Sequence, residues 1–316
     1  MISGMNNKIA IIGPYPPPYG GISVHIERIL NYLPDHAYDF YNIQKKSNRG
    51  KKFYGIWKYI YFIDFFFTQY KVIHYHSTSK KVRLLLSIIS LFRSNVYLHL
   101  HGESYTDTIS RKGITSWFLK RLIPNTHFIV SNDKLFSIIQ ELKPRSLHNF
   151  DAFIPPKFDQ NIIDIFNKSY IFPNTQYKIC MVGWFARYKN NDLYGFDLAL
   201  KALQLLRNKY TIDISIVASV NGINDNKLYS QFLEVRKEYN LDSTFILIGE
   251  NLKEVYPLYL SSHIFIRPTN ADGNSVSVKE ALWFGSPVVA SDCIIRPDEV
   301  VLKIAMLMIW LKRLCF

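Results

Sequence analysis

Two acidic residues, Asp272 and Glu280, stand eight positions apart around a short turn. Gly273, Asn274 and Ser275 complete the turn, and the residues that follow are typical of a helix. The free N–H groups and the dipole at a helix start bind phosphate, whereas the two carboxylates are suited to accept hydrogen bonds from sugar hydroxyls. Taken alone, the pattern is equally that of an ordinary turn followed by a solvated glutamate.

A strand must lead into this turn if the two acids are to form a site. The sequence predicts a strand over 263–268, a helix over 275–284 and a strand over 287–291. The same alternation precedes them, with strands over 178–183, 212–218 and 244–249 and helices over 197–208, 227–239 and 253–261. It specifies a parallel sheet covered by helices, which binds ligands at the carboxyl ends of its strands.

The first half of the chain opens in the same way. An apolar strand over 8–13 leads into the loop PYPPPYGG, and a helix follows over 22–33. This order is typical of a Rossmann-like unit. Further strands are predicted over 71–76, 96–101 and 127–131.

A polar segment, NKSYIFPNTQ, separates the two halves over 167–176. Its proline and asparagines are typical of a linker between domains. We therefore expect an α/β protein with two Rossmann-like domains, residues 1–168 and 177–316.

Four histidines form two His-x-His pairs, His74 with His76 and His99 with His101. This spacing places both rings of a pair on one face of a strand. Zinc uses such ligands, but no cysteine or carboxylate completes a set here. We therefore predict no metal site, and we interpret His74 and His99 as packed or hydrogen-bonded side chains.

The segment from Asp272 to Asp292 resembles the retaining glycosyltransferases of group 1 (family 4), which have two Rossmann-like domains facing a cleft, the GT-B fold. Their hallmark is an acid, seven residues and a glutamate, followed by a stretch that reads here ALWFGSPVVASD. The resemblance implies that Asp272 contacts the donor sugar and Glu280 the ribose. The first acid is usually glutamate, so Asp272 reaches about one methylene less far.

The resemblance extends to the first half of the chain. Gly20 and Gly21, followed by His25, are similar to the family's glycine loop near the donor phosphates. A tight turn would also explain the two glycines. His101 with Gly102 is similar to the family's His-Gly on the acceptor side, which implies that His101 orients the sugar or the acceptor.

The loop MVGWFARYKNNDLYG departs from the family. Trp184 and Tyr194 stand where the family has the arginine and lysine that bind the diphosphate. Arg187 and Lys189 lie in the same loop, and the resemblance implies that they supply this charge from shifted positions. The alternative is an ordinary pair of solvated loop residues.

The resemblance implies a hexosyltransferase that moves a sugar, with retention, from a nucleotide-sugar to a saccharide or lipid-linked acceptor in surface polysaccharide synthesis. The donor would bind mainly to the second domain and the acceptor to the first. The helix start at Asn274 and Ser275, Arg187 or Lys189, and the Gly21 amide would stabilise the departing diphosphate. No metal or further cofactor is expected.

Positive charge is concentrated in the first half, where Lys and Arg outnumber Asp and Glu by 22 to 11 over residues 1–170, against 16 to 14 over 171–316. Residues 51–71 mix this charge with aromatic side chains, as at a membrane interface, but their apolar runs are too short to span a bilayer. A single buried helix over residues 53–67, with lysines on its solvent-exposed side, explains this segment equally well. No nucleic-acid partner is expected, because no binding module accompanies the charge.

Three separated cysteines and the lack of an N-terminal signal peptide indicate a cytoplasmic protein. The basic, aromatic first half would place it peripherally at the inner face of the membrane. Family members usually continue beyond PVVASD with further helices, whereas this chain ends in LKIAMLMIWLKRLCF. We therefore expect an incomplete second domain, for which a frameshift near Lys303 would account. The alternative function is a truncated or non-catalytic relative that only binds nucleotide or membrane.

Overall fold

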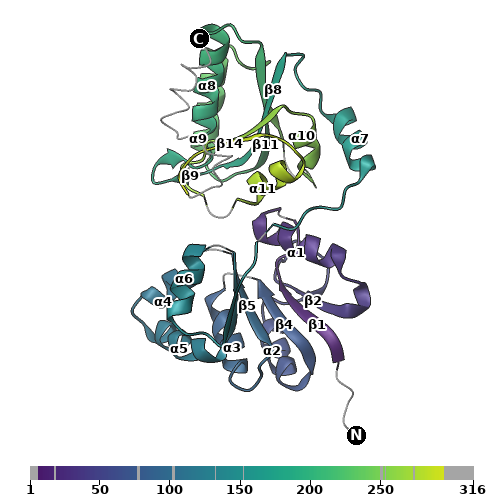
Figure 1. The fold of residues 1–316 in the computed structure, drawn as a ribbon, viewed down its shortest axis with the longest axis vertical. Coiled ribbons are helices and arrows are strands. Elements are labelled where there is room, and N and C mark those ends of the chain that lie inside the picture. Colours follow the sequence, from purple (N-terminus) through teal and green to yellow (C-terminus); the bar gives the residue numbers. More distant parts are fainter. Residues whose placement is uncertain are drawn as a thin grey trace. The chain divides into compact units, whose positions relative to one another are not determined.

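The computed structural model describes residues 6–17, 19–76, 79–101, 104–131, 133–151, 153–249, 252, 254–272 and 275–294. The chain forms two compact units, Met1–Ile154 and Pro155–Phe316 (Figure 1). Each unit contains a parallel β-sheet with helices packed on it, which confirms the predicted α/β class. The expected truncation concerns residues that lie outside the described part of the chain.

The first unit is built on a seven-stranded parallel sheet in the order β3-β2-β1-β4-β5-β6-β7. Its strands are β1 (Asn6–Gly13), β2 (Tyr38–Asn42), β3 (Lys51–Lys52), β4 (Tyr70–His76), β5 (Val96–Leu100), β6 (His127–Val130) and β7 (Ser146–Asn149). Its helices are α1 (Gly21–Tyr32), η1 (Asp35–Ala37), α2 (Trp57–Phe67), α3 (Lys80–Ile89), α4 (Ser104–Ser110), α5 (Ile114–Leu122), η2 (Ile123–Asn125) and α6 (Asp133–Glu141).

Alternate residues of each central strand face opposite sides of this sheet. On β1, Ala10 and Ile12 join the core formed with α2, α3, α5 and α6, whereas Ile11 packs under α1. On β4, Ile73 and Tyr75 join the larger core. The alternation of β4 therefore places His74 and His76 on the same side of the sheet as α1.

The second unit contains a five-stranded parallel sheet in the order β12-β11-β8-β13-β14 and a small antiparallel pair, β9 with β10. Its strands are β8 (Tyr177–Phe185), β9 (Arg187–Tyr188), β10 (Asn191–Asp192), β11 (Ile214–Ile223), β12 (Phe245–Ile248), β13 (Ile264–Arg267) and β14 (Val288–Ala290). Its helices are α7 (Gln160–Ser169), α8 (Phe196–Asn208), α9 (Asn226–Glu238), α10 (Tyr256–Leu260) and α11 (Val276–Trp283).

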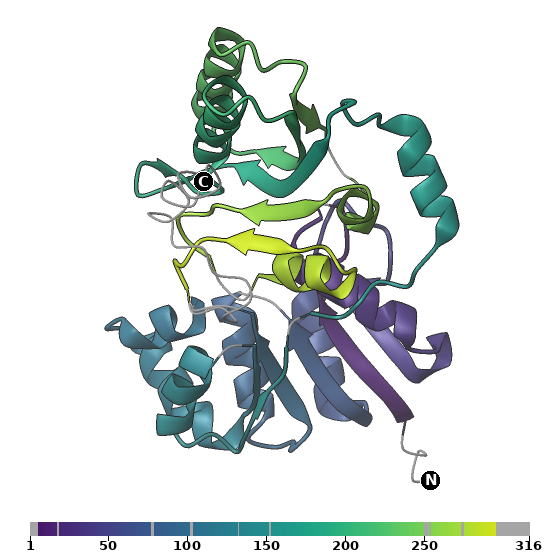
Figure 2. The ribbon, with the colours of Figure 1, turned by 45° about the horizontal axis from the view of Figure 1, so that its top comes forward.

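Helices cover both faces of this second sheet. Met181 and Phe185 of β8 pack with α8 and α9, which lie side by side (Figures 1 and 2). Cys180 and Val182 pack with α7, α10 and α11. The strand-helix alternation predicted for this half is confirmed, with ends that differ by a few residues.

The boundary between the units lies earlier than the predicted linker at 167–176. Helix α7 belongs to the second unit, because its Phe166 is buried in the core with α10 and α11. The Tyr256 hydroxyl donates to the backbone oxygen of Asp159 at 3.0 Å and accepts from its N–H at 3.1 Å. The predicted linker therefore overlaps only residues 167–169 at the end of α7.

Helix α2 is mostly not buried, in contrast to the single buried helix that was one interpretation of residues 53–67. Among its described side chains only Phe65 is buried. Several large apolar side chains are exposed, namely Trp57, Tyr59, Ile60, Ile63 and Phe67. None of the helices in the described part of the chain is long and apolar enough to span a membrane.

Candidate functional site

In the second unit, two loops meet at the carboxyl edge of the sheet. One follows β8 and leads into α8, and the other follows β13 and leads into α11. The Thr269 hydroxyl donates to the backbone oxygen of Leu193 at 2.5 Å, and the Asn270 side chain donates to that of Asp192 at 2.6 Å. These bonds hold the loop that contains Asp272 against the loop that opens α8.

Asp272 forms a two-pronged ion pair with Arg267, the last residue of β13. Arg267 Nε donates to Oδ2 at 2.9 Å and Nη2 donates to Oδ1 at 3.1 Å. The two side chains are only 11% and 7% exposed, so water screens the pair weakly. Burial alone would lower the pKa of Arg267, but its hydrogen bonds to Asp272 raise the pKa, so the arginine stays charged. Both carboxylate oxygens of Asp272 are therefore engaged by protein.

Glu280 lies on α11 and is only 5% exposed. A surface glutamate, the ordinary interpretation of the sequence, would be solvated, so the structure contradicts that interpretation for this residue. Ser275 is buried at the N-cap of α11, where its hydroxyl lies 3.1 Å from that of Ser277. Gly273 and Asn274, the other two predicted residues of this turn, lie outside the described residues.

Arg187 is not a free cation. Its Nε donates to Asp225 Oδ2 at 2.8 Å, Nη1 to the backbone oxygen of Asn190 at 3.0 Å and Nη2 to Gln231 Oε1 at 3.0 Å. The role that the resemblance implies for Arg187, supplying charge for a diphosphate, would therefore require these bonds to break. Lys189 lies in the turn between β9 and β10, with its ammonium 5.3 Å from the centre of the Tyr188 ring.

Arg267 is the site residue that the sequence did not reveal. Its guanidinium lies 5.2 Å from the centre of the Tyr194 ring, and Tyr194 stands where the resembling family has a lysine. A Cβ at Gly183 would come within 2.9 Å of the Tyr194 side chain, so this glycine makes room for the ring. Nothing in the segment HIFIRPT other than a lone cation at a strand end marks Arg267.

In the first unit, Gly20 and Gly21 lie at the start of α1, in the loop that follows β1, as predicted. The Gly20 N–H donates to Ser23 Oγ at 2.9 Å. A Cβ at Gly21 would meet nothing within 4 Å, and Gly20 has an extended backbone. Neither backbone angles nor packing within the described residues require glycine at these two positions.

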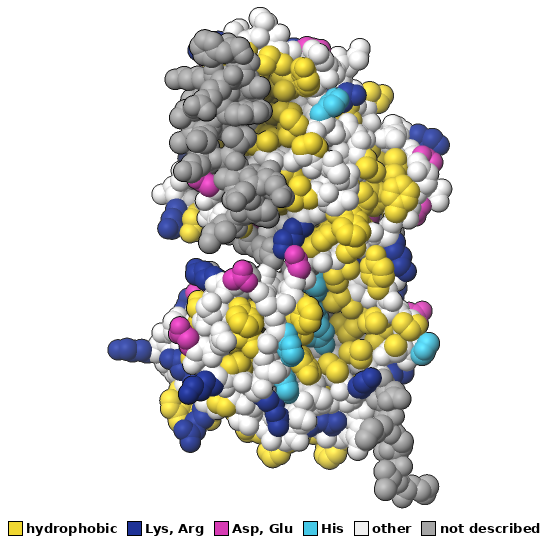
Figure 3. All heavy atoms as spheres, in the orientation of Figure 1, with side chains coloured by type: hydrophobic (Ala, Val, Ile, Leu, Met, Phe, Trp, Pro, Cys, Tyr) yellow, Lys and Arg dark blue, Asp and Glu magenta, His cyan; other side chains and the backbone are white. Residues whose placement is uncertain are grey.

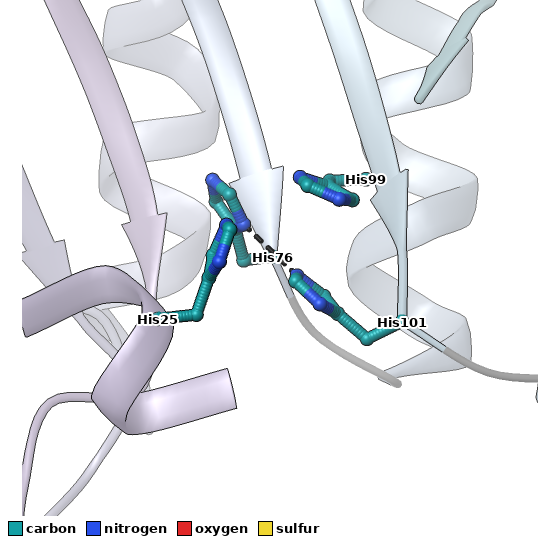
Figure 4. A group of neighbouring side chains, drawn as sticks. All are labelled: His25, His76, His99 and His101. Atoms are coloured by element: carbon teal, nitrogen blue, oxygen red, sulfur yellow. Dashed lines mark hydrogen bonds between the residues drawn. The ribbon is translucent and has the colours of Figure 1, made fainter. Parts of the chain in front are cut away.

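His101 lies just after β5 in a group of four histidines with His25, His76 and His99. Figure 4 shows the rings pointing toward one another from α1, β4 and β5. His76 Nδ1 and His101 Nε2 are hydrogen-bonded at 3.1 Å, and the rings of His99 and His101 stack with centroids 4.1 Å apart. The two rings of each His-x-His pair therefore lie on one face of their strand, as predicted, whereas the meeting of the two pairs and the contribution of His25 were not predicted.

Burial keeps these histidines uncharged. It lowers the pKa of His74, which stacks beside the group, to about 3, and it lowers the pKa of His76, His99 and His101 well below the usual value. The neighbouring histidines lower each pKa further. His101 is therefore a neutral ring that can donate or accept one hydrogen bond, not a cation.

Comparison with known proteins agrees with the architecture. Residues 177–305 match the family described as glycosyl transferases group 1. An uncharacterized glycosyltransferase from Haemophilus influenzae is 26% identical over 217 residues, which are 66% of this chain and 54% of that protein. The chain thus spans about half the length of the curated relative it matches.

Solved structures with the same fold cover both units. HepE from Anabaena, in complex with UDP and glucose, has a TM-score of 0.66 at 11% identity, with 97% of this chain and 90% of that chain covered. Sucrose-phosphate synthase from Thermosynechococcus elongatus has a TM-score of 0.67 at 14% identity, covering 98% and 88%.

WaaG, a glycosyltransferase involved in lipopolysaccharide biosynthesis, has a TM-score of 0.57 at 13% identity, covering 90% of this chain and 80% of that chain. Such low identities bear on the fold alone. The chain therefore has the two-unit GT-B fold, and residues 177–305 of its second unit are similar to the glycosyl transferases group 1 family.

Proposed function

We propose that this protein is a glycosyltransferase that uses a nucleotide-sugar donor. The observation that carries the proposal is the group 1 match over residues 177–305, which includes Asp272 and the buried Glu280. Both acids follow β13 at the carboxyl edge of a parallel sheet, where this class of fold binds its ligands. The proposed partner of Glu280 is the ribose diol of the donor, whose hydroxyls can donate hydrogen bonds to a carboxylate.

The proposed donor is a nucleoside diphosphate sugar, and the proposed outcome is retention, as in family 4. HepE, which shares the fold, was crystallised with UDP and glucose. Breaking the bond between the anomeric carbon and the diphosphate oxygen leaves positive charge on the sugar and negative charge on the leaving group. In the second unit, the start of α11 at Ser275 and the Lys189 ammonium would stabilise the leaving diphosphate, so the proposed transfer requires no metal.

The proposed acceptor is a saccharide or lipid-linked saccharide of a surface polysaccharide, reached at a membrane surface. The support is the exposed apolar side of α2 together with Ile114, Trp117 and Phe118 of α5. Lysine and arginine side chains lie among exposed apolar ones over the first unit (Figure 3). Rings at headgroup depth and cations near anionic lipid would both favour peripheral binding.

A second candidate function is a relative that binds a nucleotide but transfers no sugar. It is favoured by two observations: Arg267 engages both oxygens of Asp272, and Asp225, Gln231 and Asn190 engage Arg187. In this arrangement Asp272 and Arg187 would contact a donor only by sharing or breaking these bonds.

Donor turnover distinguishes the two candidates. We expect the purified chain to release nucleotide from a sugar nucleotide such as UDP-glucose, and Glu280→Ala and Asp272→Ala to reduce this release at least tenfold. Lys279→Ala, beside Glu280 on α11, is the matched control and should change it little. Tight donor binding without release would support the second candidate, and absence of binding would contradict both.

A further inference from the structure

We propose that His25, His76, His99 and His101 form a binding site for one transition-metal ion of the zinc type. One nitrogen from each ring can be chosen so that all four lie within 4.8 Å of one another. The rings converge from three elements of the first unit (Figure 4). This site lies beyond the proposed transfer reaction, which uses no metal.

The backbone fixes these rings close together. His76 ends β4 and His99 lies on β5, and the two residues are direct partners in the parallel pairing of these strands. His25 reaches them from α1 because Gly13 has no side chain. A Cβ at Gly13 would overlap Ile26 Cδ1 of α1 and lie 2.9 Å from the backbone oxygen of His76.

The polar atoms of the group are poorly satisfied by protein. Within the described part of the chain, both ring nitrogens of His99 and the Nε2 of His76 are buried and make no hydrogen bond. His76 is 0% exposed and His99 4% exposed. A buried nitrogen without a partner is costly, and a metal ion that accepts its lone pair would remove part of that cost.

The ligand set selects the kind of ion. Four imidazoles without a carboxylate suit Zn²⁺, Co²⁺, Ni²⁺ or Cu²⁺, whereas Mg²⁺ and Ca²⁺ prefer oxygen ligands. Zn–N bonds of about 2.0–2.1 Å in a tetrahedron place the nitrogens roughly 3.3–3.4 Å apart. His76 Nδ1 and His101 Nε2 are already 3.1 Å apart, so small rotations of the other rings would complete the site.

The surrounding charge indicates an exchangeable ion. Four neutral imidazoles leave the ion doubly positive, and the charge of the buried Arg83 acts on His101. A metal on which folding depends would be expected to have thiolate or carboxylate ligands to offset this charge. While an ion occupies the site, the nitrogen of His101 that faces His76 is not available to a sugar.

The test is a Zn²⁺ titration of the untagged, chelator-treated full chain by calorimetry, with Co²⁺ absorption as a second readout. We expect one ion per chain, the intense visible bands of tetrahedral Co²⁺, and no competition from excess Mg²⁺. His99→Gln and the half-buried His101→Gln should each weaken Zn²⁺ binding by at least the roughly 10- to 100-fold that loss of an outer-shell partner costs. His36→Gln, on the exposed surface, is the matched control.

The melting temperature of each variant shows whether it is folded, so a lost signal from an unfolded chain is recognised. Absence of stoichiometric uptake by the wild-type chain, displacement by Mg²⁺, or unchanged affinity in folded His101→Gln would overturn the proposal. The titration contains neither donor nor acceptor. Its failure would therefore leave the proposed transferase activity untouched, and failure of transfer would leave the metal site untouched.

Discussion

The ion pair between Asp272 and Arg267 is placed where a donor sugar would be expected to bind. Either the pair opens when a donor arrives, or Arg267 holds the carboxylate in position while one oxygen accepts a sugar hydroxyl. Because both side chains are nearly buried, removing the charge of one partner leaves the other uncompensated. The stability of this unit is therefore tied to the candidate site.

We predict that Asp272→Asn lowers the free energy of unfolding by about 3–5 kcal/mol, the usual cost of breaking a buried pair. Asp225→Asn is the matched control, because it neutralises an acid paired with Arg187 at a more exposed position and keeps a side chain that can cap α9. Urea denaturation of the two variants measures both effects. Equal losses of stability would contradict the distinction between the two pairs.

A substitution in the glycine loop should weaken donor binding without lowering stability. Gly21→Ala should leave the melting temperature nearly unchanged, because the added Cβ meets nothing within 4 Å and Ala is a good helix former. If the proposed function holds, the methyl group keeps a phosphate from the backbone and weakens donor binding by about tenfold, roughly 1.4 kcal/mol. Calorimetry with UDP-glucose measures this. A destabilised variant with unchanged affinity would contradict the role of the loop.

At the site, what the sequence could predict depends on how local the signal is. The placement of Asp272 after β13 and of Glu280 on α11 could be predicted, because it depends only on one strand, one turn and one helix that are consecutive in the sequence. The partner of Asp272 could not be predicted, since Arg267 lies on the strand before the turn and depends on where the loop folds back. The engagement of Arg187 by Asp225 likewise joins residues 38 positions apart.

At the scale of elements, the histidines of β4 and β5 make folding sensitive to acid. His74 has a pKa of about 3 in the folded state against an ordinary value of 6.5, and His76, His99 and His101 are shifted in the same direction. Between pH 6.5 and the lower pKa of the folded state, these histidines take up protons in the unfolded chain but not in the folded chain. The contribution of these neutral histidines to the stability of the folded state is complete above pH 6.5, and it is lost as the pH falls toward the pKa of the folded state.

We therefore predict that the free energy of unfolding falls below pH 6.5, with each such histidine contributing up to about 1.4 kcal/mol per pH unit. Urea denaturation at several pH values, in the presence of a chelator, measures the slope. His74→Gln should reduce the slope, and the exposed His36→Gln should not. A slope that is the same for wild type and His74→Gln would show that His74 is not held neutral.

The exposed apolar side of helix α2 leads to a prediction about membrane binding. If its apolar side binds lipid, Ile63→Ser with Phe67→Ser should reduce sedimentation with anionic liposomes at least tenfold. These side chains are 59% and 79% exposed, so the fold should tolerate the change. The matched control is Ile165→Ser with Phe158→Ser, which removes side chains of the second unit that are 65% and 61% exposed. Equal effects of the two double variants, or liposome binding that ignores anionic lipid, would argue against a lipid-binding role.

The elements themselves were largely predictable, because parallel strands buried on both faces read as short apolar runs between amphipathic helices. The alternation from β8 to β14 follows the predicted order, except that the small antiparallel pair of β9 and β10 was not predicted and the ends of the elements differ. Helix α7 was not predicted, although Ile162, Ile163 and Phe166 have helical spacing and pack in the core of the second unit. Helix α7 belongs to the second unit because it contacts α10, a helix that is distant from it in the sequence.

At the scale of the molecule, the two units present different chemistry. The first unit contains the histidine group, the glycine loop and the exposed apolar helices, and the second contains Asp272 and Glu280 in the region that matches the group 1 family. Two Rossmann-like units in one chain could be inferred from alternation, but the boundary between them depends on which core buries α7. The proposed activity requires that the chain bind a nucleotide-sugar.

Thermal unfolding with a panel of UDP-, GDP- and other sugar nucleotides tests this central claim most directly. A ligand present at 100 times its dissociation constant stabilises the folded state by about 2.7 kcal/mol. We predict that at least one sugar nucleotide raises the melting temperature of the wild-type chain, and that Glu280→Gln removes this shift while Lys279→Gln retains it. No shift with any sugar nucleotide at millimolar concentration would contradict the account.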